Sequence, residues 1–302
     1  MRLNLSDEKD INSKYGLVDC HVHLTNKILA KNIDHYLDLS LKSGVQGFIN
    51  SGFKQFFYNE PRLSEKKSFI KTAVGISHLF ANEEIFFDTY NITLEEGIKF
   101  VYDWSILSDV IAIGEIGLER ENIFWTQEEK INKYKIISSN RNYRLPSMNE
   151  QIYLFDSQLR IAERVNLPVI IHCENADDVL VSLLQKYEKK HIRGMIHGFC
   201  KGLHIAKKYR EKGLFLSLNF SILYPENIEA LRAVKEMGLG NFVLETDAPG
   251  FPPPRSKKGI INFPSNLPHF AELLRKELEM SEDDFYGTLS HNVNQLFGIK
   301  FN

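Results

Sequence analysis

A repeated alternation of short apolar runs and amphipathic segments constrains the fold of this chain more than any other feature. Strands and helices that alternate in this way predict a parallel sheet with helices on its faces. Eight such repeats predict closure into a TIM (β/α)8 barrel, which commonly runs as one domain at this length. We therefore expect an α/β barrel as a single domain over residues 1–302. The expected strands are 17–24, 45–50, 69–76, 109–115, 168–172, 193–197, 214–219 and 241–246. The expected helices are 30–43, 61–67, 93–106, 150–165, 175–189, 202–212, 225–236 and 266–279, then short terminal helices at 281–289 and 292–297.

Residues 120–149 interrupt this rhythm. The segment is rich in Asn, Lys, Arg, Ser and aromatic residues and has no clean period. It is too long for an ordinary connection within a barrel, so we interpret it as an insertion. Two readings stay open, a lid or binding loop on the one hand and a disordered excursion on the other.

Charge and cysteine content limit the environment and the partners. The formal net charge is −2, so no global basic field attracts nucleic acid. The first ten residues lack the apolar core of an export signal, and no later run is long and apolar enough to cross a membrane. Three cysteines without zinc-knuckle spacing favour a reducing compartment. We expect a cytoplasmic protein with no membrane partner.

Two histidines, His21 and His23, stand two residues apart in the first expected strand, LVDCHVHL at 17–24. Residues i and i+2 of a strand share a face, so both imidazoles can reach one ion. Histidine is the commonest metal ligand near neutral pH. The pair alone is weak evidence, because ten histidines in the chain make it frequent by chance.

Four more metal-competent residues stand at the ends of later expected strands. Glu115 ends the fourth, His172 the fifth, His197 the sixth, and Asp247 follows the eighth. In a parallel barrel these ends meet on one face, where the active site of this fold is built. Each residue alone has an ordinary alternative, such as a satisfied rim histidine or a turn aspartate. Together they favour a metal site.

Four imidazoles and two carboxylates exceed what one ion with an open position needs, so a binuclear centre is expected. Glu115 is the natural bridging ligand, because a carboxylate has two oxygens to share. Histidine favours Zn²⁺, whereas the oxygen ligands also admit Mg²⁺ or Mn²⁺. Two divalent ions activate water and stabilise charge on a substrate, which is typical of hydrolysis.

Five motifs resemble one family, the TatD-type metal-dependent deoxyribonucleases of the amidohydrolase superfamily. They are HVH at 21–23, GEIGL at 114–118, IIH at 170–172, HGFCKG at 197–202 and ETDAP at 245–249. NFP at 262–264 and NQLFGI at 294–299 also match the family's habits. The similarity runs in order from the first strand to the C-terminus.

The resemblance implies a TIM barrel, two divalent ions and hydrolysis of phosphodiester bonds in DNA, often from a 3′ end. The expected partner is therefore DNA, as a single strand or at its 3′ ends. By position, His21, His23 and Asp247 would hold one ion, His172 and His197 the other, and Glu115 would bridge them. A metal-bridging hydroxide would attack phosphorus, with Asp247 taking the proton, which makes Asp247 and Glu115 the candidate catalytic residues.

Several departures from the family pattern leave this ligand set intact and affect the substrate instead. The family's Gly-x-His-Pro is GISHL at 75–79, which moves the histidine to His78, and its usual arginine after the fifth strand is Glu174. After Gly-Leu the family prefers Asp and an aromatic residue, whereas this chain has Glu119 and Arg120. The candidate substrate-binding residues are His78, Lys201 and Arg255, the last two as phosphate ligands.

Two other functions stay open at this stage. Glu174 and the low net charge are also compatible with an esterase, amidase or lactonase of the same superfamily that acts on a small molecule or an aminoacyl ester. A non-catalytic subunit of a larger assembly is the third reading, and the complete set of six ligands speaks against it.

Overall fold

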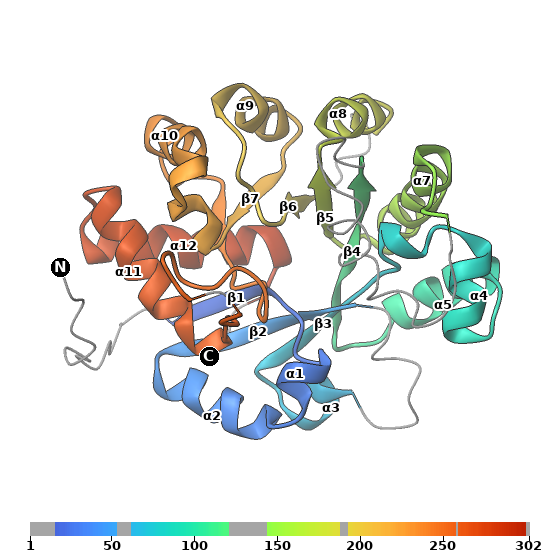
Figure 1. Cartoon of the computed structure of the whole chain (residues 1–302), viewed down its shortest axis with the longest axis horizontal. Helices are drawn as coiled ribbons and strands as arrows, with labels where there is room; N and C mark the ends of the chain where they lie inside the picture. The colour runs from blue at the N-terminus through green and yellow to red at the C-terminus, as the bar shows by residue number, and fades with distance from the viewer. Residues whose placement is uncertain (1–15, 53–61, 121–143, 188–192, 258, 300–302) are drawn as a thin grey trace. The chain divides into compact units, whose positions relative to one another are not determined.

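The computed structural model describes residues 16–52, 62–120, 144–187, 193–257 and 259–299. Its eight strands form one sheet in sequence order, and the register shows parallel pairing. Helices alternate with the strands along the chain, as Figure 1 shows. This is the TIM-barrel fold predicted above, so that prediction is confirmed. The strands are β1 (Leu17–Val22), β2 (Val45–Ser51), β3 (Ile70–Val74), β4 (Val110–Glu119), β5 (Val169–Glu174), β6 (Gly194–Ile196), β7 (Phe215–Leu218) and β8 (Phe242–Leu244).

Amphipathic helices connect most of the strands. They are α1 (Lys27–Ala30), α2 (Ile33–Lys42), α3 (Leu63–Lys66), α4 (Glu83–Tyr90), α5 (Leu94–Ser105), α7 (Met148–Val165), α8 (Asp177–Gln185), α9 (Leu203–Glu211), α10 (Ile228–Met237), α11 (Leu267–Glu277) and α12 (Glu282–Phe297). The strands themselves are almost wholly buried and apolar, as expected for a parallel sheet covered by helices.

Two expectations about helices were wrong. Helix α4 was not predicted, although Asn82 caps it by accepting hydrogen bonds from the backbone N–H groups of Glu84 and Ile85. The two short terminal helices are one continuous helix, α12. Its buried residues Phe285, Leu289 and Val293 follow helical spacing, and Gly287 between them does not interrupt the helix.

The fourth strand is also longer than predicted. It was expected to end at Glu115, but β4 continues to Glu119 and pairs with β5 along this extension, with Gly117 opposite His172. Because side chains alternate along a strand, Glu115 and Glu119 share one face. Most of the insertion predicted at 120–149 lies outside the described residues, and Met148 and Asn149 already belong to α7.

The described chain packs as two compact units, each treated by itself below. The terminal unit comprises residues 16–50, 198–203, 217–257 and 259–299. In it, β1 lies beside β2 and also beside β8, where the backbone N–H of Asp247 donates to the carbonyl of His21 at 3.0 Å. Helix α12 packs on β1 and β8, and α11 packs on β1.

The central unit comprises residues 51–52, 62–120, 144–187, 193–197 and 204–216. Strands β3 to β6 lie side by side in it, and α5 and α7 pack on β4. A capping box starts α7, in which Ser147 and Glu150 each bind the other's backbone N–H. Within the described residues, none of the helices combines the length and hydropathy that a membrane crossing requires.

Candidate metal centre

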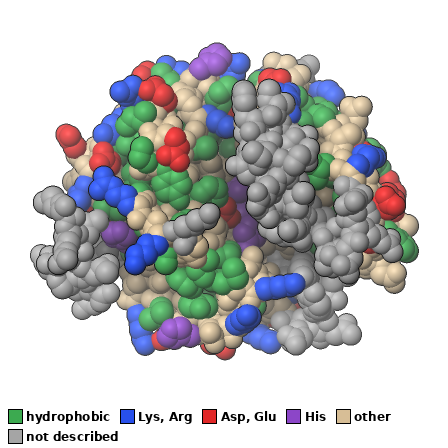
Figure 2. Space-filling view, viewed as in Figure 1, with side chains coloured by type: hydrophobic (Ala, Val, Ile, Leu, Met, Phe, Trp, Pro, Cys, Tyr) green, Lys and Arg blue, Asp and Glu red, His purple; other side chains and the backbone are tan. Residues whose placement is uncertain are grey.

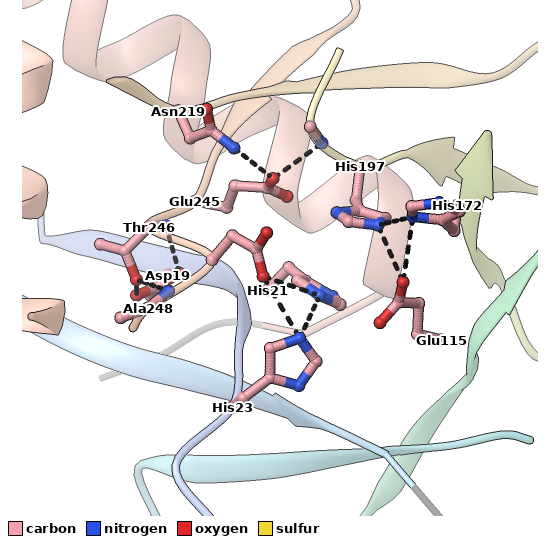
Figure 3. Close-up of polar contacts among 12 residues, drawn as sticks. Asp19, His21, His23, Glu115, His172, His197, Asn219, Glu245, Thr246 and Ala248 are labelled. Carbon is pink, nitrogen blue, oxygen red and sulfur yellow. Dashed lines mark hydrogen bonds and ion pairs between the residues drawn. The ribbon is translucent and has the colours of Figure 1, made fainter. Parts of the chain in front are cut away.

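Three predicted ligands meet in the central unit, one within β4, one within β5 and one directly after β6. His172 Nδ1 lies 3.0 Å from His197 Nε2 and 3.2 Å from Glu115 Oε1. His197 Nε2 lies 3.1 Å from the same Glu115 oxygen. Figure 3 shows the three side chains converging on one point. We call Glu115, His172 and His197 the central ligand set.

A glycine allows the strands that carry this set to approach. A Cβ added at Gly117 would lie 2.0 Å from the carbonyl oxygen of His172, closer than two such atoms can come. Steric crowding therefore explains the second glycine of GEIGL. Any larger residue at Gly117 would separate β4 from β5 at the level of His172.

The other three predicted ligands meet in the terminal unit. His21 Nε2 and His23 Nε2 lie 3.2 Å apart, and Asp247 Oδ1 lies 3.5 Å from the first and 3.2 Å from the second. Figure 3 shows both imidazoles turned toward each other. His21 is fully buried, whereas the side chain of His23 is 30% exposed, so one side of this terminal ligand set stays open.

Hydrogen bonds on both sides hold Asp247 in place. Thr246, its neighbour, donates its backbone N–H and its hydroxyl to the two carboxylate oxygens of Asp19, at 2.9 and 2.5 Å. The Thr246 carbonyl accepts from Asn262, and the Thr246 hydroxyl accepts from the N–H of Ala248. Asp247 itself has a φ of 49°, a conformation that needs such support outside glycine.

The histidines also tune the Asp247 carboxylate. Burial raises the pKa of Asp247, but the hydrogen bonds and charges of His21 and His23 outweigh burial and hold the pKa well below its usual range. In the central set, burial lowers the pKa of His172, whereas Glu115 and Glu119 raise it, with a net rise. Both sets thus place a carboxylate against imidazoles.

Both ligand sets fit a divalent ion. In a tetrahedral site with bonds of about 2.0–2.1 Å, neighbouring ligand atoms lie about 3.3–3.4 Å apart. The central triangle has edges of 3.0, 3.1 and 3.2 Å, and the terminal one has edges of 3.2, 3.2 and 3.5 Å. Three nitrogen and oxygen donors at these separations suit Zn²⁺ and similar ions.

Glu245, adjacent to this network, was not predicted to matter. It is fully buried, and one of its oxygens accepts from the backbone N–H of Gly198 at 2.7 Å and from the amide of Asn219 at 3.1 Å. This carboxylate therefore ties β8 to the turn that follows β6 within the terminal unit. The strand-end pattern ETD contains Glu245, but nothing in the sequence separates an anchoring carboxylate from a ligand.

The three predicted substrate-binding residues lie in different surroundings. His78 is buried, and its Nε2 lies 3.0 Å from Glu119 Oε2, while its ring stacks on that of His172. Lys201 is half-buried in the turn after β6, and Arg255 is exposed in the loop after β8. Their roles toward a substrate stay predictions.

Comparisons with known proteins identify the family. A family model described as TatD related DNase matches residues 18–298. The metal-dependent hydrolase YabD of Bacillus subtilis (strain 168) is 24% identical over 94% of this chain and 99% of its own length. The protein named 3′-5′ ssDNA/RNA exonuclease TatD of Escherichia fergusonii is 24% identical over 94% of this chain and 100% of its own.

A solved structure supports the fold. The crystal structure of YjjV, a TatD homologue from Escherichia coli K12, has a TM-score of 0.75 at 22% identity and covers 94% of this chain and 98% of its own. The match spans the strands and helices described above.

Proposed function

The chain belongs to the family of TatD-related DNases, and from this premise we propose that it is a 3′-5′ exonuclease that uses two divalent ions to hydrolyse phosphodiester bonds in DNA. Family membership makes it a metal-dependent hydrolase. The observation that carries the proposal is the pair of three-residue ligand sets, each with the edge lengths of an ion site. The name of the Escherichia fergusonii relative supports a nucleic-acid substrate.

In this proposal each ligand set holds one ion. The ions, when bound, lower the pKa of water and neutralise charge on the phosphoryl oxygens. The chain's own residues orient the reaction. Asp247 accepts the proton of the attacking water at a carboxylate oxygen, and the hydrogen bonds of Thr246 to Asp19 and Asn262 hold the backbone directly before it. Glu115 would hold an ion through its carboxylate together with His172 and His197.

Phosphate binding is assigned to a few local cations. On the face drawn in Figure 2, Lys and Arg side chains are interspersed with Asp and Glu, and the net charge is −2. Affinity for DNA therefore has to come from particular residues rather than from a basic field. We assign this role to Lys201 and to the exposed Arg255, which lies eight residues after Asp247 in the same loop.

The test is digestion of single-stranded and double-stranded DNA labelled at the 5′ end, with Mg²⁺, Mn²⁺ or Zn²⁺ and with EDTA. We expect a ladder of labelled fragments that shortens from the 3′ end and disappears with EDTA. RNA of the same sequence forms a parallel arm. Glu115→Ala and Asp247→Asn should remove the activity, with a loss of about 10²–10⁴-fold for Asp247→Asn if it moves the proton. The control is Asp283→Asn, the same change at an exposed position of α12.

One residue favours a second candidate function. Glu174 ends β5, two residues after His172, and lies opposite Glu119 in the strand register. An added carboxylate at this position opposes a phosphodiester and suits a neutral ester, amide or lactone. DNA that stays intact with every ion, together with turnover of such a compound, would replace the nuclease proposal with this one.

A further inference from the structure

Three side chains of the central unit form a buried cluster beside the central ligand set. The cluster consists of His78, Glu119 and His172. Glu119 Oε2 lies 3.0 Å from His78 Nε2 and 3.4 Å from His172 Nε2. The two imidazoles stack, with ring centres 4.5 Å apart and planes 12° apart. The side chains of His78 and Glu119 are 5% and 4% exposed. One carboxylate oxygen thus faces two imidazole nitrogens away from water.

His172 therefore has a carboxylate at each of its nitrogens. Its Nδ1 faces Glu115 Oε1 at 3.2 Å and His197 at 3.0 Å, while its Nε2 faces Glu119 at 3.4 Å. An imidazole binds an ion through a nitrogen that carries no proton, and the partner of the other nitrogen decides which one that is. Glu119 lies at ion-pair distance from Nε2 without an aligned hydrogen bond, so it acts on this nitrogen through its charge, which favours the proton at Nε2 and leaves the lone pair on Nδ1.

Two glutamines of α7 hold the backbone that carries this cluster. Gln151 accepts from the N–H of Glu119 at 2.8 Å and donates to its carbonyl at 3.0 Å. Gln158 does the same for Ile76, two residues before His78, at 2.7 and 2.9 Å. Seven residues separate the glutamines, so they share one face of the helix. Both glutamines are buried, so their amides need these hydrogen-bond partners in place of water.

We propose that Glu119, with His78 at its side, is a positioning residue that fixes the ring of His172 so that Nδ1 points at Glu115 and His197 and can bind an ion. This inference rests on the metal site of the proposed function. It gives His78 and Glu119 a joint role. Both depart from the family pattern, His78 by its position and Glu119 by standing where the family prefers Asp, and their side chains contact each other.

The experiment measures metal binding without a substrate. Metal-free wild type and Glu119→Gln are titrated with Co²⁺, following visible absorption and the number of ions bound, and with Zn²⁺ against a chelator. Wild type should bind two ions. The amide keeps the shape of the side chain but removes its charge, so one ion should bind about 10–100-fold more weakly, with a changed Co²⁺ spectrum. The ion of His21, His23 and Asp247 should keep its affinity and serves as the internal reference.

Asp109→Asn is the matched control. Asp109 precedes β4, at the opposite end of the strand from Glu119, and binds Arg62 through both oxygens at 2.8 and 2.9 Å. This variant makes the same chemical change and removes a structural ion pair, so it should lower stability without changing either ion. Glu119→Asp is the second variant. It keeps the charge but ends about 1.5 Å short, so it should show a smaller loss in the same direction.

The outcomes separate this proposal from the nuclease proposal. Two ions bound with wild-type affinity and an unchanged spectrum in Glu119→Gln would overturn the positioning role. The nuclease proposal would not be affected by this result. A third ion in wild type that is lost in Glu119→Gln would also overturn it, because the cluster would then be an ion site itself. Selective loss of one ion in Glu119→Gln would support the positioning role. If wild type also left DNA intact with every ion, the nuclease proposal would be refuted while the positioning role stood.

Discussion

Thr246 donates two hydrogen bonds to Asp19, one from its backbone N–H and one from its hydroxyl, so that each oxygen of this buried carboxylate has a donor. The two residues come from opposite ends of the chain, on β1 and directly after β8. Asp19 shares its strand face with His21, and Thr246 precedes Asp247. This pair of hydrogen bonds therefore joins the two segments that carry the terminal ligand set.

Thr246→Val should destabilise the protein and weaken the terminal ligand set. The substitution keeps the shape of the side chain but leaves one oxygen of buried Asp19 without its hydroxyl donor, which costs about 1–3 kcal/mol. Urea unfolding of the metal-free protein measures the loss. Thr246→Ser retains the hydroxyl and should remain closer to wild type. A Thr246→Val variant as stable as wild type would show that the hydroxyl donor to Asp19 does not contribute to stability.

Asp19 also predicts how stability depends on pH. Burial raises the pKa of Asp19 from an ordinary value of 3.8 to about 8. The folded state then keeps a proton that the unfolded chain has released, so the free energy of unfolding falls by up to about 1.4 kcal/mol per pH unit. This contribution is fully present below the unfolded pKa and is lost as the pH rises toward 8.

The measurement compares metal-free wild type with Asp19→Asn from pH 4 to pH 9. Asparagine does not titrate, and the histidines common to both proteins cancel in the difference. The stability of wild type relative to the variant should decline with pH and then level off above about 8. A difference that stays constant over this range would mean that Asp19 is ionised in the folded state throughout.

Gln158→Leu tests the contact between α7 and the segment before His78. The change leaves the backbone N–H and carbonyl of Ile76 without partners in a buried place. Each of the two lost partners costs about 1–3 kcal/mol, so a loss of about 2–6 kcal/mol is expected. Chemical denaturation measures it, with Glu163→Gln on the exposed side of the same helix as the control, expected within about 0.5 kcal/mol. If Gln158→Leu lost no more stability than the control, the backbone N–H and carbonyl of Ile76 would have other hydrogen-bond partners in the variant.

Strand-end positions made the clustering of the candidate ligands predictable. His21, His172 and Asp247 stand where apolar runs stop, and parallel strands bring such residues together whatever their distance in sequence. Glu119 was missed for a specific reason. The expected strand ended at Glu115, and only its continuation shows that period-two alternation puts both carboxylates on one face.

Other contributions had no sequence signal. Gln151 and Gln158 occupy buried positions on α7, but a glutamine that binds a backbone edge looks the same in sequence as one in water. Asp19 likewise lies between apolar residues, and its partner Thr246 is 227 positions away. Such contacts depend on tertiary packing, which local patterns do not contain.

Gly117→Ala should separate the central ligands although it changes none of them. A Cβ at this position would lie 2.0 Å from the carbonyl oxygen of His172, and backbone atoms on neighbouring strands can only respond by moving apart. Overpacking of this kind costs about 1–3 kcal/mol, and the shift of His172 relative to Glu115 should weaken one ion. Co²⁺ titration and thermal unfolding measure both effects. Gly240→Ala is the control, since a Cβ there meets no atom within 4 Å and its stability should change by less than about 0.5 kcal/mol. If Gly117→Ala binds both ions as tightly as Gly240→Ala does, the close approach of β4 and β5 is not what holds His172 at its ion.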